Sequence, residues 1–263
     1  MLGWMTILVR RLSARIRYCA GEIVRRAVRN LVETVITDLD LMWQIRGVMS
    51  SAEFEHDYLS RAKGFKGRTE LLSWALDQAN DNDGLFLEFG VYKGDSLNLL
   101  ADLKSDVMWH GFDSFVGLPE DWSLGAKAGA FDVKHKLPAV RSNVRLVSGF
   151  FDKTLETFLA KNPGKKVAFL HVDCDLYSST KTVLVALRDR LVPGSIILFD
   201  ELINYPGWQD QEYRAFMEYV AEQNVSFEYI GYVRTSSRVA VKLTRVTERC
   251  SLTTEDSASR AYS

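Results

Sequence analysis

The sequence has few cysteines, no long apolar run and almost no net charge, and each of these absences excludes a class of protein. The three cysteines, Cys19, Cys174 and Cys250, lie far apart and form no CxxC pair, which indicates neither a disulfide framework nor a zinc site. No run of about 18 uninterrupted apolar residues occurs, so we expect no membrane-spanning helix. With 33 basic and 34 acidic residues, the formal charge of -1 favours no nucleic-acid partner. We therefore expect a cytoplasmic protein in a reducing setting.

The chain is long enough for one sizeable core with appendages. It has 263 residues, of which 47% are hydrophobic and 25% are charged, a balance typical of globular proteins. We predict three parts. They are a basic, amphipathic helical extension over residues 1–50, a main domain over residues 51–245, and a disordered tail over residues 246–263 that is rich in Ser and Thr.

The N-terminal extension combines an apolar stripe with a basic face. The first thirty residues contain seven arginines and only one acidic residue, Glu22. One interpretation is a helix that packs on the domain or on a second subunit of a homo-oligomer, and another is a helix on an anionic membrane surface. An arginine-rich organelle transit peptide is a third, whereas a secretory signal is not expected. The apolar residues at helical spacing are Trp4, Leu8, Leu12, Ile16, Cys19, Ile23, Ala27, Leu31 and Val35.

Beyond the extension, strand and helix patterns alternate regularly. Short apolar runs predict strands, and amphipathic runs between turn-forming residues predict helices. Repeated strand-helix units imply an α/β fold with a mostly parallel sheet and helices on both faces, which binds ligands at the carboxyl ends of its strands. The strands are expected over residues 85–89, 107–112, 144–147, 167–172, 195–199, 227–232 and 239–243, and the helices over 68–79, 97–103, 153–159, 180–191 and 211–223.

Polar residues follow the first two of these strands. After Glu88, Gly90 and Gly94 would let the backbone approach a ligand closely, although an ordinary tight turn has the same pattern. Amides at the following helix start would suit a carboxylate of that ligand. Asp113 ends the second strand, where such folds bind ribose hydroxyls, and the alternative is a cap on Ser114 and its neighbour Phe115.

Acidic residues gather after two later strands. Asp173 and Asp175 lie on the same side if their strand continues, but a turn after Asp173 would separate them. Asp200 and Glu201 follow the next strand, and three converging carboxylates need a cation, a shared proton or a hydrogen-bond donor to coexist. If a cation is present, oxygen ligands of this kind suit Mg²⁺ better than zinc. Simple helix caps are the alternative. His171 lies inside its strand, which favours a core histidine over a catalytic base.

Five linked motifs resemble the macrocin O-methyltransferase family in order and spacing. The resemblance covers residues 61–216. Characterised members of that family methylate sugar hydroxyls on antibiotics, so the resemblance implies a Rossmann-like sheet of seven strands, S-adenosylmethionine as cofactor, and Mg²⁺ held by three acids. The motifs are EFGVYKGDS, GFDSFVGLPEDW, VSGFFDKTL, HVDCDLYSST and PGSIILFDE.

Site residues carry over from the family motif by motif. The metal ligands become Asp173, Asp200 and Glu201, with a departure at Glu201, where the family commonly has Asp. Asp173 is the expected base for the acceptor hydroxyl and His171 the second candidate. The stretch over residues 122–138 has no match, which leaves the acceptor open. The implied cofactor-binding residues are Glu88, Gly90, Tyr92, Gly94, Ser96, Asp113, Ser114 and Gly149.

The predicted function is Mg²⁺-assisted O-methylation of a small hydroxyl compound, a sugar among the candidates. Trp122, Tyr205 and Trp208 suggest an aromatic wall for it, although core packing explains them equally well. A glycosyltransferase is an alternative, because residues 173–175 have the DxD form that holds the metal of a nucleotide-sugar. A non-catalytic partner protein with the same fold is another. A dinucleotide dehydrogenase is disfavoured by the lack of GxGxxG.

Overall fold

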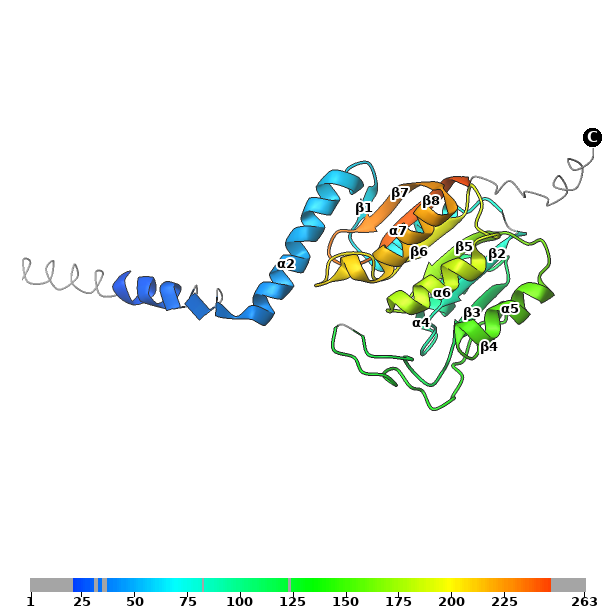
Figure 1. Cartoon of the computed structure of the whole chain (residues 1–263), viewed down its shortest axis with the longest axis horizontal. Helices are drawn as coiled ribbons and strands as arrows, with labels where there is room; N and C mark the ends of the chain where they lie inside the picture. The colour runs from blue at the N-terminus through cyan, green and yellow to red at the C-terminus, as the bar shows by residue number, and fades with distance from the viewer. Residues whose placement is uncertain (1–20, 31–32, 35–36, 82, 123, 247–263) are drawn as a thin grey trace, which may run out of the picture.

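The computed structural model describes residues 21–30, 33–34, 37–81, 83–122 and 124–246 (Figure 1). The predictions for the first twenty residues and for the tail after residue 246 lie outside the described residues. Residues 21–30 are helical, as the apolar spacing predicts. Among the described residues, none of the helices combines the length and the apolarity that are needed to cross a bilayer.

Within the described residues, eight strands form a single sheet in the order β1-β7-β8-β6-β5-β2-β3-β4. Only β8 is antiparallel to its neighbours, which confirms the Rossmann-like, mostly parallel sheet. The strands are β1 (Lys63–Phe65), β2 (Leu85–Phe89), β3 (Trp109–Asp113), β4 (Val144–Ser148), β5 (Val167–Val172), β6 (Ile196–Phe199), β7 (Val225–Val233) and β8 (Val239–Val246).

The strand count corrects the expected seven. The extra strand is β1, which pairs in parallel with β7 at the edge of the sheet. Its three residues are too few to produce an alternating pattern, so nothing in the local sequence distinguishes it from a loop.

Helices cover both faces of the sheet, because the strands bury side chains on both sides. On β2, Leu85, Leu87 and Phe89 belong to one apolar cluster and Phe86 to the other. Residues of α3 (Arg68–Asp77) and α4 (Asp95–Leu103) complete the cluster that contains Phe86. Residues of α5 (Phe151–Lys161), α6 (Tyr177–Leu187) and α7 (Glu212–Gln223) complete the opposite cluster, and these three helices lie side by side in Figure 1.

A long helix, α2 (Leu39–Phe54), joins the extension to the domain and continues into a π-helical turn, η1 (Glu55–Leu59). Its C-terminal half packs tightly on the loop after β6: a Cβ at Gly47 would lie 2.6 Å from the backbone of Tyr205. Asn204 N donates to Ser51 Oγ (2.7 Å), and Trp208 Nε1 donates to Ser50 Oγ (3.0 Å). The predicted boundary at residue 50 therefore falls inside a helix that belongs to both parts.

The sheet order reverses between β2 and β5. The chain moves from β2 to β3 and β4 on one side, then returns to β5 and continues to β6 on the other. In open α/β sheets the loops diverge at such a switch point and leave a crevice at the carboxyl ends of the strands. The polar residues that the motifs contain follow these strand ends.

Candidate active site at the switch point

A cavity of about 860 Å³ lies at the carboxyl ends of β2, β3, β5 and β6. Its lining comes from the β2–α4 turn, the loop after β3, and the starts of α5 and α6. Of the cofactor-binding residues predicted from the sequence, the cavity wall contains Gly90, Tyr92, Ser96, Asp113 and Ser114.

The β2–α4 turn requires glycine where it passes the end of β5. Gly90 has φ +94°, and a Cβ there would lie 1.6 Å from the carbonyl oxygen of Asp173. Asp173 N donates to Phe89 O (2.8 Å), so the two chain segments are joined at this point. Gly94 (φ +83°) is the N-cap of α4. Since L-residues rarely adopt such backbone angles, glycine supplies both the turn and the close approach.

Asp113 holds the outer side of the same turn. Its Oδ2 accepts hydrogen bonds from Val91 N (2.8 Å) and Tyr92 N (2.7 Å), and its Oδ1 accepts from Phe115 N (2.7 Å). The cap on Phe115 that the sequence offered as an alternative is therefore present. The carboxylate also lines the cavity, and its predicted contact with a ribose stays a prediction.

Glu88 lies behind the cavity wall instead of in it. Its side chain is completely buried, with Oε1 accepting from Ser96 Oγ (2.9 Å) and Oε2 lying 2.9 Å from His171 Nδ1. Gly94 and Gly149 are also absent from the described lining, and Gly149 N donates to Asp113 O (2.9 Å). These three residues lie behind the cavity wall and contact residues that line it or adjoin it. Their predicted contact with the cofactor stays a prediction.

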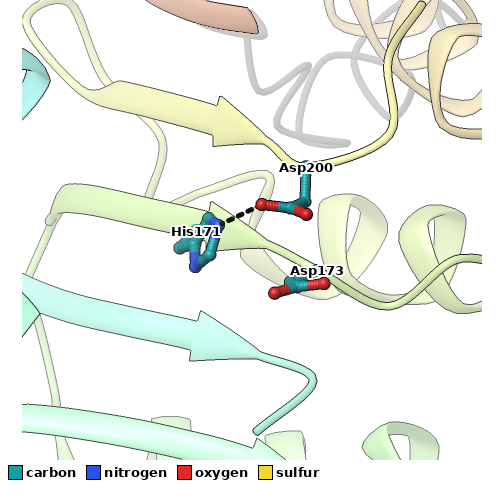
Figure 2. A group of neighbouring side chains, drawn as sticks. All are labelled: His171, Asp173 and Asp200. Carbon is teal, nitrogen blue, oxygen red and sulfur yellow. Dashed lines mark hydrogen bonds and ion pairs between the residues drawn. The ribbon is translucent and has the colours of Figure 1, made fainter. Parts of the chain in front are cut away.

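His171 lies between two carboxylates and does not reach the cavity. It is completely buried, and its Nε2 is 3.4 Å from Asp200 Oδ1 (Figure 2), whereas its Nδ1 contacts Glu88. Although burial opposes the charged form, hydrogen bonds to Asp200 and Glu88 raise the pKa of His171 to about 10. Both ring nitrogens contact buried carboxylates and the ring does not line the cavity, so no described contact supports a role as base, and that role stays a prediction.

Asp200 is directed toward an arginine from another part of the chain. Arg238 Nε and Nη2 bind its two carboxylate oxygens at 2.7 and 2.6 Å. Burial opposes ionisation, but the bonded His171 and the guanidinium of Arg238 lower the pKa of Asp200. Asp200 is 3% exposed and does not line the cavity. It is thus engaged in a buried ion pair and not presented to a ligand.

The acids that face the cavity are Asp173, Asp175 and Glu201. One oxygen from each lies within 4.8 Å of the others, and all three line the wall. The predicted set, carried over from the family motifs, included Asp200 in place of Asp175, and the side on which Asp175 lies was left open. In the structure, Asp175 adopts φ +63° and returns toward Asp173. A second close group contains His171, Asp173 and Asp200, but both ring nitrogens of His171 already contact buried carboxylates.

The charges of this carboxylate group fit a cation. Burial, and next the charge of Asp200, raises the pKa of Asp173 to about 8 and that of Asp175 to about 6. The same two causes raise the pKa of Glu201 well above its ordinary value. Glu201 Oε2 is buried and has no hydrogen-bond partner within the described part of the chain. An oxygen of this kind, beside two further carboxylates, suits a hard divalent ion.

Sequence reasoning missed other contributors to the site. Arg68, the first residue of α3, lines the cavity with Nη2 3.7 Å from Asp173 Oδ2. Glu212, the first residue of α7, accepts a hydrogen bond from Glu201 N (3.1 Å). Both lie outside the linked motifs, at helix starts that offer no local sign of their distant partners.

The cavity wall also contains aromatic and hydroxyl-bearing residues. Trp122 and Phe131 line it from the loop after β3, and Ser178, Ser179 and Thr182 line it from α6. Tyr205 and Trp208, which the sequence grouped with Trp122, are instead 7% and 3% exposed and pack beneath α2. Of the three suggested wall residues, only Trp122 therefore lines the cavity.

Comparison with known proteins identifies the domain. Residues 87–202 match a methyltransferase domain family. The demethyldecarbamoylnovobiocin O-methyltransferase of Streptomyces niveus is 28% identical over 58% of this chain and 66% of its own length. The mycinamicin III 3''-O-methyltransferase of Micromonospora griseorubida is 26% identical over 68% of this chain and 81% of its own.

Solved structures agree with this result. The calicheamicin methyltransferase CalS11 superposes with a TM-score of 0.56 at 28% identity, over 66% of this chain and 77% of its own. The chain thus contains a methyltransferase domain over residues 87–202 and is similar to O-methyltransferases over about two thirds of its length. The matching family is the general methyltransferase domain, so the narrower macrocin family stays a prediction.

Proposed function

We propose that the protein transfers the methyl group of S-adenosylmethionine to a hydroxyl of a sugar-bearing small molecule. The observation that carries the proposal is the cavity at the switch point, where a glycine turn and three acids meet. The relatives support the acceptor class: one is named for the 3'' position of mycinamicin III, and another, from Streptomyces olivaceus, for the 4' position of a rhamnosyl tetracenomycin.

We propose that the cofactor binds at the β2–α4 turn. Gly90 lines the cavity where the turn passes the end of β5, and Ser96 lies on the wall within the first turn of α4. A helix N-terminus attracts a carboxylate, which suits the methionine part of the cofactor. We expect Tyr92, Asp113 and Ser114 to contact the nucleoside part, because they line the wall next to the turn.

We propose that Asp173, Asp175 and Glu201 hold Mg²⁺. When bound, a divalent cation lowers the pKa of a coordinated hydroxyl. Asp173 is the proposed proton acceptor, because it lines the cavity beside the other two acids. The acceptor oxygen forms a bond to the methyl carbon as the bond from that carbon to sulfur breaks. The hydroxyl proton passes to Asp173, and S-adenosylhomocysteine leaves.

Thermal unfolding with two ligands tests this proposal. S-adenosylhomocysteine at about 100 times its dissociation constant should stabilise the protein by roughly 2.7 kcal/mol. Uridine diphosphate with Mg²⁺ should leave the unfolding midpoint unchanged. Stabilisation by the nucleoside diphosphate alone would contradict methyl transfer and favour a glycosyltransferase.

We further propose that the N-terminal extension binds a second copy of the chain. Leu39 and Met49 on α2 are 81% and 60% exposed, so α2 presents unburied apolar surface. Residues 1–37 contain seven arginines and two acids, whereas the whole chain has 33 basic and 34 acidic residues, so the remainder is acidic. Opposite charges on extension and domain attract between copies, while an acidic domain is repelled by an anionic membrane.

The oligomeric state tests the role of the extension. Light scattering should show a multimer for the full chain and a smaller species after Arg25, Arg26 and Arg29 are all replaced by Glu. Flotation of the full chain with anionic liposomes, at unchanged oligomeric state, would instead support the membrane interpretation.

A further inference from the structure

We propose that Glu212 is a positioning residue that holds the backbone of Glu201 so that the Glu201 carboxylate faces the cation. This inference rests on the proposed metal site. Glu212 opens α7, eleven residues after Glu201 in the chain. It contributes no oxygen to the close carboxylate groups found among the described residues, so its role is not that of a ligand.

The position of Glu212 is unusual for an acid. Its side chain is completely buried. Oε2 accepts a hydrogen bond from Glu201 N (3.1 Å), and Oε1 has no hydrogen-bond partner within the described residues. Burial of a polar oxygen without a partner costs free energy, so packing alone does not account for an acid here. The one described bond that it makes is to the backbone of a proposed metal ligand.

The backbone of Glu201 is held on both sides, while its side chain is not. Glu212 accepts from its N–H, and Tyr205 Oη donates to its carbonyl oxygen (3.0 Å). By contrast, Glu201 Oε2 has no hydrogen-bond partner among the described residues. The contacts therefore fix where the side chain starts and leave its far end directed to the cavity wall.

A glutamate at this position needs such restraint. Each additional rotatable bond widens the volume that a carboxylate samples and raises the entropy lost when it binds an ion. Holding the backbone limits that spread. Removal of groups that orient metal ligands typically lowers metal affinity about 10–100-fold. We expect a loss in this range when the acceptor at position 212 is removed.

Calorimetric titration with Mg²⁺, in the presence of saturating S-adenosylhomocysteine, tests the inference. Glu212→Met fills a similar volume but accepts no hydrogen bond, and it should weaken Mg²⁺ binding about 10–100-fold. Glu212→Gln keeps an oxygen for the Glu201 N–H and should bind Mg²⁺ within about threefold of wild type. Recovery by the glutamine variant distinguishes positioning from a general effect of altering α7.

Glu218 provides a matched control on the same helix. It accepts hydrogen bonds from Tyr177 Oη (2.6 Å) and Lys181 Nζ (2.6 Å) of α6 and from Arg214 Nε (2.9 Å) of α7 itself. None of these contacts involves Glu201. Glu218→Ala should loosen α7 and leave Mg²⁺ affinity unchanged. Circular dichroism on each variant verifies that the helices remain.

The outcomes separate this inference from the metal site on which it rests. Normal Mg²⁺ binding by wild type and by Glu212→Met would overturn the role of Glu212 alone. Equal losses in Glu212→Met and Glu218→Ala, or no recovery in Glu212→Gln, would also overturn it. Absence of binding by wild type would overturn the proposed metal site, and the role of Glu212 with it.

Discussion

Replacement of Arg238 by Met tests whether Asp200 belongs to the scaffold or to the metal site. The guanidinium binds both oxygens of Asp200 at 2.7 and 2.6 Å, and the two side chains are only 21% and 4% exposed. Removing one partner of a buried ion pair costs about 3–5 kcal/mol, because the remaining charge has no compensation. Asp200 still has His171 at 3.4 Å in this variant. We therefore expect the free energy of unfolding to fall by about 3 kcal/mol, the lower end of that range.

Urea unfolding in the presence of a chelator measures this cost, and a double-mutant cycle with Asp200→Asn isolates the pair. The cycle should give a coupling energy of about 1 kcal/mol or more. In parallel, Asp200→Asn should bind Mg²⁺ nearly as well as wild type, whereas Asp175→Asn should lose about tenfold or more in affinity. An Asp200→Asn protein of unchanged stability that no longer binds Mg²⁺ would refute the reasoning and restore Asp200 as a ligand.

Three further predictions concern the acids and the histidine. His171→Gln should lower the free energy of unfolding by about 3 kcal/mol, because Glu88 and Asp200 lose the cation between them. A fall in kcat at unchanged stability would instead make His171 a base. Asp173→Asn should lower kcat by about 10²-fold or more without changing the affinity for S-adenosylhomocysteine. A larger loss in Asp175→Asn would assign the proton to Asp175. The pKa values of Asp175 and Asp173, about 6 and about 8, lie above the ordinary Asp value, so their stabilising contribution is present at low pH and is lost as pH rises through these values. The melting temperature of the chelated protein should fall across that window, and Mg²⁺ should oppose the fall; a melting temperature that rises with pH would contradict the shifts.

The sheet could be predicted because its strands are apolar on both faces. All six residues of β5 are buried, and such a continuous run between turn-forming residues is a strong local signal. Element ends were predicted less well. The helix expected over residues 180–191 spans Tyr177–Leu187, because the polar residues at its start resemble a loop. The three residues of β1 gave no signal at all.

The sequence predicts which strand ends form the candidate site. It does not predict which side chains there contact one another. Sequence order indicates that Asp173, Asp175, Asp200 and Glu201 follow neighbouring strands, so they had to lie near one another. Which of them faces the cavity depends on Arg238, which precedes β8 and binds Asp200. Contacts between residues so far apart in the chain come from the packed fold and leave no local pattern.

The central claim, that the cofactor binds over the β2–α4 turn, is tested most directly by calorimetric titration with S-adenosylhomocysteine on two alanine variants. A Cβ at Gly90 would lie 1.6 Å from the carbonyl oxygen of Asp173, whereas one at Gly164 meets no atom within 4 Å, and both glycines have positive φ. Gly164→Ala therefore reports the backbone strain alone, about 1–2 kcal/mol. We predict that wild type and Gly164→Ala bind one equivalent, while Gly90→Ala, in which the clash must displace the β2–α4 turn from the end of β5, binds none. Equal binding by all three proteins would contradict the claim.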